Sequence, residues 1–496
     1  MDTRLRVLMV AAEAHPLAKV GGLADVMGAL PKALAGLGQH VRIAMPYYGT
    51  IKDKRLAVER VKGADLKVPV GDTVRRGNVW LAQVPGSQVT AMLIENDHFF
   101  GRAGIYGDPK TGKDYPDNAE RFIFFSKAVV ALAEKIKWGP DIIHCHDHQV
   151  GLIPAWLKTS ATAGALKQAA TVFTIHNLAY QGLYPIDVAG QAGFGSDLAK
   201  PMGPLEFYGK LNMMKAGIVF ADSITTVSPT YASEIQTSEF GHGLEGVLKS
   251  RREDLVGILN GADYEVWDPA TDGLLPSNYS SADLAGKTRC KASLIKQARL
   301  KCDLASPLVG IVSRLVEQKG FDILTEAMDA IMGLGLSLVV LGTGEKKYQD
   351  ALAACAKRFR GRLSLTVGFD EELAHLIEAG CDMFLMPSKF EPCGLNQMYS
   401  MKYGTIPVVR KTGGLADSVT DFDEGADSTG FLFAEYSARS LLAALERARK
   451  VFVSTAQWKD LVARAMARDF SWTRSAKAYQ QVYTSMVDRK RAVSRS

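Results

Sequence analysis

The sequence lacks any apolar run long enough to cross a membrane. Its first apolar run, Leu5–Val10, is far shorter than the roughly 20 residues that a membrane-spanning helix needs. No signal or transit peptide is recognisable before that run. The six cysteines are scattered, without the paired short spacings of zinc sites or disulfide frameworks. We therefore expect a cytoplasmic, bacterial-type protein with free thiols, no metal and no contact with a membrane.

The sequence also lacks a strong excess of charge of one sign. Lysine and arginine number 59 and aspartate and glutamate 53, which gives a formal net charge of +6 over 496 residues. No basic block alternates with aromatic residues and no zinc-finger motif is present, so we expect no nucleic-acid binding. The mild basic excess is compatible with small anionic ligands. The basic tail, Asp488–Ser496, is expected to be a solvated terminus.

A dinucleotide-binding fingerprint is missing as well. No G-x-G-x-x-G stands directly after a predicted strand with an acidic residue about 20 positions later. This argues against an NAD-dependent dehydrogenase, and we expect no cofactor.

The length predicts two domains, because single cores stop growing at about 250–300 residues. The first begins with a buried strand at Leu5–Ala11, a glycine break, and a helical pattern that Gly38 closes. Pro31 lies inside that pattern, so we expect a kink or an early interruption there. The stretch Tyr47–Asp117 is expected to be irregular, with hairpin-like alternation, as a flap at the mouth of a site. Further strands are predicted at Val41–Met45, Trp80–Val84, Val89–Ile94, Ile142–His144, Thr171–Ile175 and Ser223–Thr226.

A cleaner alternation of strands and helices begins near Pro307. Such alternation predicts βαβ units and a parallel sheet. We therefore predict an α/β fold with two Rossmann-like doubly wound lobes that face each other across a deep cleft, with ligands outside the carboxyl ends of the strands. The predicted strands are Leu308–Val312, Leu336–Leu341, Leu363–Val367, Met383–Met386 and Ile406–Val409, and the predicted helices are Phe321–Met332, Glu345–Arg358, Glu371–Ala379 and Gly394–Tyr403.

One short motif occurs twice. KVGGLADV at 19–26 returns as KTGGLADSV at 411–419, each time after a predicted strand and at the start of a predicted helix. A glycine pair there lets backbone N–H groups approach an anion at a helix N-terminus. The alternative is that the glycines only make a tight strand-to-helix turn.

Four signatures carry a resemblance to a known family. They are KVGGLADV (19–26), HCHDH with TIHNLAYQG (144–148 and 174–182), SRLVEQKG (313–320) and PSKFEPCGLNQMYSMKYGTIPVVRKTGGLAD (387–417). In this order they resemble the bacterial-type glycogen synthases and starch synthases. The resemblance covers essentially the whole chain, including GILNGAD (257–263) and DFSW (469–472).

The resemblance implies the GT-B fold and an enzyme that transfers glucose from ADP-glucose to the non-reducing end of an α-1,4-glucan such as glycogen, with retention of configuration. It implies an acceptor-side lobe at 1–256, a donor-side lobe at 257–470, and a C-terminal helix with a basic tail at 471–496 that crosses back to the first lobe. The alternatives are a related retaining transferase that uses UDP-glucose, and a glucan-binding protein without catalysis.

Five residues are expected to carry the chemistry. Arg314 and Lys319 lie on one loop, where a guanidinium fork and an ammonium would hold the departing phosphate; the alternative is a solvated pair. By resemblance, Glu391 binds hydroxyls of the donor glucose, although it could instead cap a helix. His176 matches the family's active-site histidine, with a satisfied structural histidine as the alternative. Asp147 matches an aspartate that orients groups near the acceptor.

The resemblance also implies a set of substrate-binding positions. Lys19 would approach the diphosphate, Phe369 stands where a tyrosine often stacks on adenine, and Cys393 would form a wall of the site. The full set is Lys19, Gly21, Gly22, Asp25, Asn260, Phe369, Cys393, Gly394, Leu395, Thr412, Gly413 and Gly414.

Three histidines raise the question of a metal. His144, His146 and His148 alternate, so a strand could point all three to one face. Strand geometry is expected to end near Cys145, and the family uses no metal, so we predict none. His148 stands where the family usually has tryptophan, and Asn396 where threonine is common.

Retaining glycosidases use a pair of carboxylates. These motifs contain no convincing second carboxylate to accompany Glu391. The resemblance implies instead a front-face substitution in which the departing phosphate takes the proton of the acceptor hydroxyl.

Overall fold

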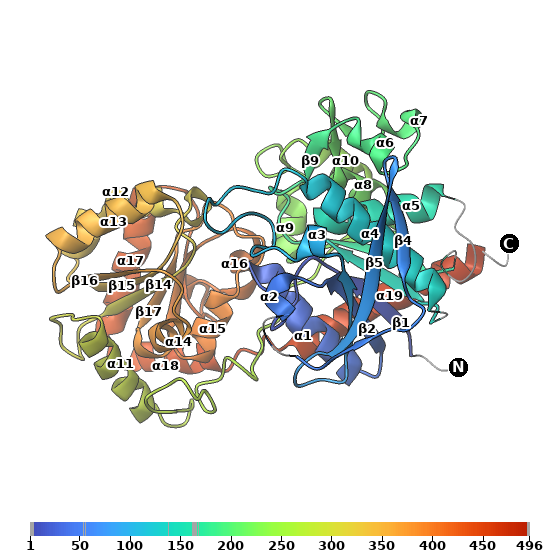
Figure 1. Cartoon of the computed structure of the whole chain (residues 1–496). Coiled ribbons are helices and arrows are strands. Elements are labelled where there is room, and N and C mark those ends of the chain that lie inside the picture. Colours follow the sequence, from blue (N-terminus) through green and yellow to red (C-terminus); the bar gives the residue numbers. More distant parts are fainter. Residues whose placement is uncertain are drawn as a thin grey trace. The chain divides into compact units, whose positions relative to one another are not determined.

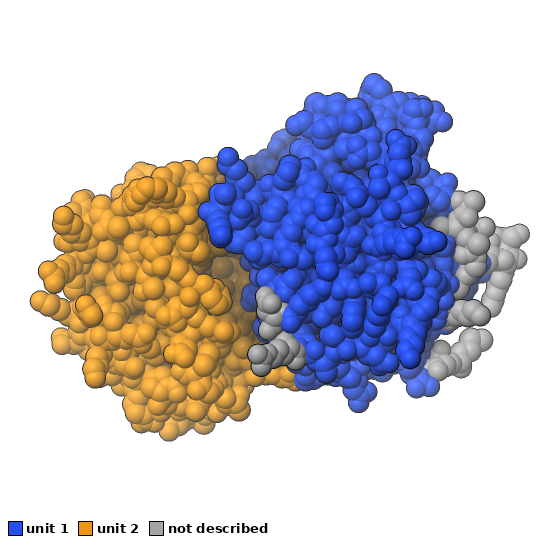
Figure 2. Space-filling view, viewed as in Figure 1, with its two compact units in different colours: residues 1–227, 232–261, 472–496 blue, residues 228–231, 262–471 orange. Residues whose placement is uncertain are grey.

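The structure is a computed structural model that describes residues 4–493 except 53, 55, 137, 161–165 and 167. It divides into two compact units, coloured separately in Figure 2. Unit 1 comprises residues 1–227, 232–261 and 472–496, and unit 2 comprises residues 228–231 and 262–471. Residues 494–496 of the basic tail lie outside the described part. No described helix is both long and apolar enough to traverse a bilayer, and all six cysteines are free thiols.

Unit 1 is built on a sheet with the strand order β13-β12-β8-β7-β1-β2-β6-β5-β3, in which β4 pairs with β5 (Figure 1). The strands from β13 to β6 are parallel. A second, three-stranded sheet has the order β10-β11-β9. The strands are β1 (Arg6–Val10), β2 (His40–Pro46), β3 (Val58–Arg60), β4 (Leu66–Val70), β5 (Thr73–Gln83), β6 (Thr90–Glu95), β7 (Ile142–His146), β8 (Ala170–Ile175), β9 (Leu183–Pro185), β10 (Glu206–Phe207), β11 (Lys210–Asn212), β12 (Ser223–Thr226) and β13 (Leu255–Gly257).

Most helices of this part of the chain come between two strands in the order of the sequence. They are α1 (Gly22–Gly36), α2 (Gly49–Lys52), α3 (Asp97–Phe100), α4 (Asn118–Lys135), α5 (Leu152–Thr159), α6 (Val188–Gln191), α7 (Ser196–Ala199), α8 (Met213–Phe220), α9 (Pro229–Glu234), α10 (Glu245–Ser250) and, from the far end of the chain, α19 (Trp472–Val493).

The structure differs in part from two expectations for unit 1. The stretch Tyr47–Asp117 is not irregular: it holds β3 to β6, where β5 pairs antiparallel with β3, β4 and β6. Antiparallel strands that keep one face in solvent carry weak apolar runs, and most of β5 is not buried. Pro31 does not end α1, which continues to Gly36. Its neighbours Leu30 and Leu34 are fully buried, and burial of such side chains outweighs the hydrogen bond that proline removes.

Unit 2 is a six-stranded, fully parallel sheet with the order β16-β15-β14-β17-β18-β19 (Figure 1). Its strands are β14 (Leu308–Val312), β15 (Ser337–Gly342), β16 (Leu363–Val367), β17 (Met383–Met386), β18 (Ile406–Arg410) and β19 (Phe431–Phe433). Its helices are α11 (Ala285–Gln297), α12 (Phe321–Gly333), α13 (Lys346–Arg358), α14 (Glu371–Gly380), α15 (Asn396–Lys402), α16 (Gly413–Ser418), α17 (Ala438–Val453) and α18 (Thr455–Met466).

The predicted strands and helices of unit 2 are all present. One helix starts two residues later than predicted: α15 begins at Asn396 and not at Gly394. Gly394 has φ +71°, a left-handed conformation that a helix cannot include and that favours glycine.

The C-terminal helix α19 packs against α1 and β8 within unit 1. A buried polar chain ties it to the sheet. The Tyr483 hydroxyl lies 2.7 Å from His144 Nδ1, and His144 Nε2 lies 2.6 Å from Thr174 Oγ1. Thr174 Oγ1 in turn lies 2.5 Å from Thr225 Oγ1. Hydroxyls from α19 and β8 therefore satisfy a histidine in the middle of the core, and a hydroxyl from β12 bonds the second of them.

We predict that Tyr483→Phe lowers the stability of unit 1 by about 1–3 kcal/mol, because His144 Nδ1 would remain buried without a partner. The measurement is the shift of the urea unfolding transition. Tyr208→Phe, the same change at a ring that is 84% exposed, should leave the transition in place. Equal transitions for the two variants would contradict the anchoring role.

Candidate active site

In unit 2 the candidate residues gather where the strand order reverses. The chain proceeds from β14 to β15 and β16 on one side, and then to β17, β18 and β19 on the other. The loops after adjacent strands β14 and β17 therefore diverge and leave room for a ligand between them. Arg314 and Lys319 lie on the first of these loops and Glu391 lies on the second.

Lys319 and Glu391 form an ion pair at this point. Lys319 Nζ lies 2.5 Å from Glu391 Oε2, and the two side chains are 18% and 7% exposed. The Ser388 hydroxyl donates to the same carboxylate oxygen at 3.0 Å. Glu391 therefore does not cap a helix through these contacts, and Lys319 is not simply solvated. Arg314 is exposed on the same loop, free of such burial.

Close backbone packing holds these loops together. A Cβ on Gly320 would lie 1.9 Å from the carbonyl oxygen of Pro387, and one on Gly413 would lie 1.9 Å from that of Glu391. Both glycines also have positive φ. The Gly414 N–H donates to the carbonyls of Glu391 and Pro392 at 3.1 and 3.2 Å. The second copy of the glycine motif thus serves as a tight turn that fixes the loop of Glu391.

The remaining candidates of unit 2 follow other strands of the same sheet or lie close to Glu391 in sequence. Cys393, two residues after Glu391, and Thr412, directly before Gly413, are buried, and Leu395 precedes α15. Phe369 follows β16 and is 84% exposed. The Gly368 N–H that precedes it donates to the Gly342 carbonyl at the end of β15, so the ring stands at the carboxyl edge of the sheet.

Unit 1 repeats this plan at the boundary between β1 and β7. The chain proceeds from β1 to β2 on one side and from β7 to β8 and β12 on the other. The loop after β1 carries Lys19, Gly21 and Gly22. Asp147 follows β7 directly, and His176 follows β8. Asn260 lies beyond β13, and its buried Oδ1 has no hydrogen-bond partner in the described part of the chain.

Glu13 is a site residue that the sequence analysis missed. It is 3% exposed, and its Oε2 accepts the N–H groups of Val20 and Gly21, the latter at 3.0 Å. Burial raises the pKa of Glu13 above its usual value, against the lowering effect of these bonds. The first glycine motif therefore already binds a carboxylate of the protein. An acidic residue directly after a buried strand was the available signal.

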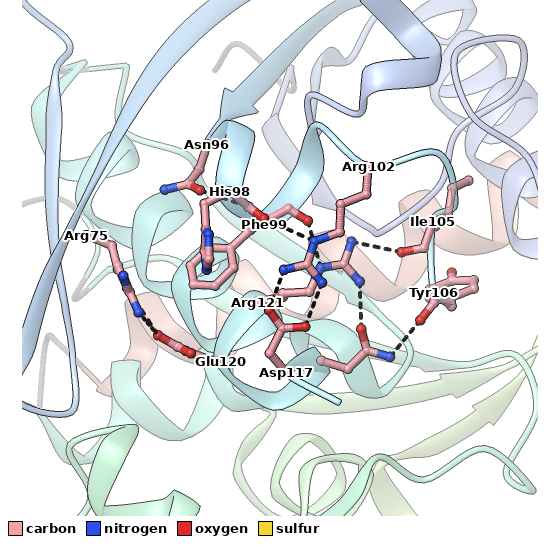
Figure 3. Close-up of polar contacts among 11 residues, drawn as sticks. Arg75, Asn96, His98, Phe99, Arg102, Ile105, Tyr106, Asp117, Glu120 and Arg121 are labelled. Carbon is pink, nitrogen blue, oxygen red and sulfur yellow. Dashed lines mark hydrogen bonds and ion pairs between the residues drawn. The ribbon is translucent and has the colours of Figure 1, made fainter. Parts of the chain in front are cut away.

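The other oxygen of Glu13 accepts a hydrogen bond from the Tyr106 hydroxyl, and a buried arginine supports the loop of Tyr106. Arg121 is 0% exposed and lies at the centre of Figure 3, where it donates to the carbonyls of Phe99 and Ile105. It also donates to the Asn118 side chain at 2.6 Å, which in turn donates to the Tyr106 carbonyl at 2.8 Å. This network fixes the loop after α3 against α4.

The two exposed charges of the first motif pair with each other. Lys19 Nζ lies 2.6 Å from Asp25 Oδ1, and their side chains are 43% and 27% exposed. Asp25 lies in the first turn of α1, where the helix dipole favours a negative charge. Lys19 is thus a solvated cation with one local partner.

Asp147 and His176 are joined directly. The His176 backbone N–H donates to Asp147 Oδ1 at 2.8 Å, and Asp147 adopts φ +61° to reach it. Burial raises the pKa of Asp147 to about 7 and lowers the pKa of His176 to about 3. The site thus contains a neutral imidazole beside a carboxyl group that titrates near neutrality.

The three alternating histidines have separate roles: the rings of His144 and His146 lie 4.0 Å apart, but each bonds a different partner. His144 is held by Tyr483 and Thr174, His146 contacts His176, and His148 begins a 3-10 helix after β7. Among the described residues, no group of three or more His, Cys, Asp or Glu side chains is placed to hold a metal ion.

Comparisons with known proteins agree with this geometry. The starch synthase catalytic domain family matches residues 6–250, and the glycosyl transferases group 1 family matches residues 295–451. A glycogen synthase of Anaeromyxobacter dehalogenans (strain 2CP-C) is 47% identical over 97% of this chain and 100% of its own.

Two solved structures are similar to the chain. The catalytic domain of starch synthase IV from Arabidopsis thaliana, bound to ADP and acarbose, has a TM-score of 0.91 and 36% identity, over 98% of this chain and 100% of that one. Sucrose-phosphate synthase from Thermosynechococcus elongatus, at 18% identity over 97% and 99% of the two chains, has a TM-score of 0.60 and so shares the fold. Together with the two Rossmann-like units, these matches show the predicted GT-B fold.

Acid should destabilise unit 1 through its buried histidines. Burial lowers the pKa of His144 to about 3, below the value of about 6.5 in an unfolded chain. The stabilisation from a neutral His144 is therefore complete above pH ~6.5. It is lost as the pH falls toward the pKa of His144 in the folded protein.

The difference between wild type and His144→Gln isolates this effect from the opposite contribution of Asp147. Below pH ~6.5, the stability of the wild type relative to the variant should fall by about 1.4 kcal/mol per pH unit. Urea unfolding between pH 7 and 5 measures it, with exposed His98→Gln as the control. Parallel curves for wild type and His144→Gln would refute the assignment.

Proposed function

The chain belongs to the family of glycogen synthases and starch synthases, and from this we propose that it transfers glucose from ADP-glucose to an α-1,4-glucan such as glycogen. The acceptor group is the 4-hydroxyl at the non-reducing end, and the anomeric configuration is retained. The observation that carries the proposal is the Lys319–Glu391 ion pair at the reversal of strand order in unit 2.

Unit 2 is proposed as the donor side. Cleavage of the sugar–diphosphate bond places negative charge on the departing phosphate, and preorganised cations stabilise that charge. Lys319 is held at one position by Glu391, and exposed Arg314 offers a guanidinium fork from the same loop. Glu391, already bonded to Ser388, accepts hydroxyls of the donor glucose with its remaining lone pairs. The exposed ring of Phe369 provides a face for the nucleobase.

The glycine turns complete the donor side. We assign Cys393, Gly394 and Leu395 to the wall of the site, and Thr412, Gly413 and Gly414 to the loop that supports Glu391. The Gly414 N–H is bonded to backbone carbonyls, so its contribution is to the shape of the loop.

Unit 1 is proposed as the acceptor side. Its residues at the β1/β7 boundary include three carboxyl groups, Glu13, Asp25 and Asp147, and one exposed cation, Lys19. Carboxylates accept hydrogen bonds from sugar hydroxyls and repel phosphate. Because Glu13 already occupies the N–H groups of Val20 and Gly21, Gly21 and Gly22 shape this loop, and Lys19 alone reaches toward the diphosphate. His176 and Asn260 add hydrogen-bonding groups near the reacting sugar.

The geometry also supports a front-face substitution. A retaining double displacement needs a carboxylate free to attack the anomeric carbon. Glu391 is bonded to Lys319 and Ser388, so it is poorly suited as a nucleophile. In the proposed step the bond between the anomeric carbon and the phosphate oxygen breaks, and the acceptor oxygen bonds to the same face. The departing phosphate takes the hydroxyl proton.

Two alternatives are separated by a donor assay. The protein is incubated with glycogen and either ADP-glucose or UDP-glucose, and nucleoside diphosphate release is followed with and without the glucan. Glucan-dependent release of ADP is the expected result. Faster release of UDP would assign the donor to UDP-glucose and direct attention to Phe369. Glucan binding without release from either donor would favour a non-catalytic paralogue.

A cytoplasmic location stays a prediction.

Replacement of Lys319 or Arg314 by alanine should lower kcat by about 10²–10³, the cost of removing one preorganised donor to a developing oxyanion. Steady-state kinetics with saturating glycogen measure this loss. Lys346→Ala is the matched control, because Lys346 is 86% exposed and pairs only with Asp350 within its helix in the described structure. Near-native turnover of both Lys319→Ala and Arg314→Ala would remove the two residues from the mechanism.

A further inference from the structure

His146 is a buried residue that the mechanism above does not use, and it contacts His176 directly. His146 is 0% exposed in β7, and its Nδ1 lies 2.9 Å from His176 Nε2. The ring centroids of the two residues are 5.2 Å apart. On its other side, the ring of His146 lies 4.0 Å from that of His144.

The orientation of the His146 ring depends on the His144 ring, which its own hydrogen bonds hold in place. Both ring nitrogens of His144 are bonded, one to Tyr483 and one to Thr174. His144 therefore cannot rotate without breaking a buried hydrogen bond, which costs about 1–3 kcal/mol. His146 packs on this fixed ring and inherits its orientation.

A hydrogen bond between two imidazole rings needs one nitrogen that carries a proton and one that does not. Burial lowers the pKa of both His146 and His176 far below neutrality, so each ring carries a single N–H. Nε2 of His146 is buried and has no hydrogen-bond partner among residues 4–493 that the structure describes. A buried N–H without an acceptor is rarer than a buried acceptor without a donor. The proton of His146 is therefore on Nδ1, and His146 donates to His176 Nε2.

This arrangement decides the tautomer of His176, because the hydrogen bond at one ring nitrogen determines which nitrogen is protonated. With Nε2 as the acceptor, the proton of His176 is on Nδ1. Asp147 does not compete for the ring, since its carboxylate bonds the backbone N–H of His176. His176 is partly exposed while His146 is fully buried, so Nδ1 is the ring nitrogen left for a ligand.

We propose that His146 is a positioning residue that holds His176 as the Nδ1–H tautomer, so that His176 presents a hydrogen-bond donor to a hydroxyl oxygen of the reacting sugar. The sugar as ligand rests on the proposed function, whereas the tautomer rests on the structure of unit 1. No proton is transferred by His176 in this role, because the ring stays neutral.

The first test reads the tautomer directly. The protein is labelled with 15N-histidine, and the ring nitrogens of His176 are assigned by their disappearance in His176→Asn. The expected spectrum at pH 7 shows protonated Nδ1 and unprotonated Nε2. In His146→Leu, which removes the donor, His176 should lose this preference. A wild-type spectrum with protonated Nε2 would overturn the proposal.

The second test separates hydrogen bonding from packing. The amide of asparagine can place a donor near the position of Nδ1, so His146→Asn should keep the Nδ1–H signature of His176 and wild-type kcat. His146→Leu should lower kcat about fivefold to tenfold, the worth of one hydrogen bond, with KM for the sugar nucleotide changed less than twofold. His40→Leu, at an exposed position of the same sheet, is the control for the substitution itself.

Equal losses in His146→Asn and His146→Leu would assign His146 to packing alone and overturn the positioning role. If His146→Leu does not fold, the spectra of wild type and His146→Asn still decide the matter. Absence of glucosyl transfer by the wild type, together with the Nδ1–H signature, would refute the proposed function while leaving the His146–His176 bond in place.

Discussion

Both units depend on the parallel pairing of buried central strands. β1 pairs with β7 and β14 pairs with β17, and these strands are buried almost throughout. Burial on both faces leaves no freedom to shift register, because a slip of one residue would exchange the two faces of every strand. All the strands of each parallel set therefore end at one edge of the sheet. Where the strand order reverses, the loops diverge. Polar groups that would destabilise the core if they were buried in it lie on these loops, next to the core.

The two edges have different chemistry even though they share a sequence motif. In unit 2 the polar centre is a lysine paired with a buried glutamate, with an exposed arginine and an exposed aromatic ring nearby. In unit 1 it consists of carboxyl groups and neutral imidazoles. The repeated glycine motif meets a side-chain carboxylate in unit 1 and backbone carbonyls in unit 2. The two copies also differ in what their backbone requires: a Cβ at Gly413 or Gly414 would collide with a carbonyl oxygen, whereas a Cβ at Gly21 or Gly22 would meet nothing within 4 Å.

The accuracy of the sequence-based predictions follows from burial. β14 and β17 have the predicted bounds, because strands that are buried on both faces read as continuous apolar runs between turn residues. The bounds of β16 are also as predicted, although this strand is only partly buried. The antiparallel strands β3 and β4 were missed, and β5 was predicted only from Trp80 onward, because exposed positions dilute the apolar signal. Glu13 was missed, and His146 was considered only as a metal ligand, because a contact between residues far apart in the chain leaves no local signal: Glu13 binds Tyr106, 93 residues away, and His146 binds His176, 30 residues away.

By itself, the sequence determined the fold class, the family and the residue types of the candidate site, since these are written in local periodicity and in contiguous motifs. The tertiary structure alone decided which groups meet. It paired Lys319 with Glu391 across 72 residues and closed a hydrogen bond between His144 and Tyr483 across 339. It also shifted the pKa of Asp147 and His176 in opposite directions. Hydrogen bonds and desolvation act over a few ångströms in space. The separation of two residues along the chain does not show whether they come that close.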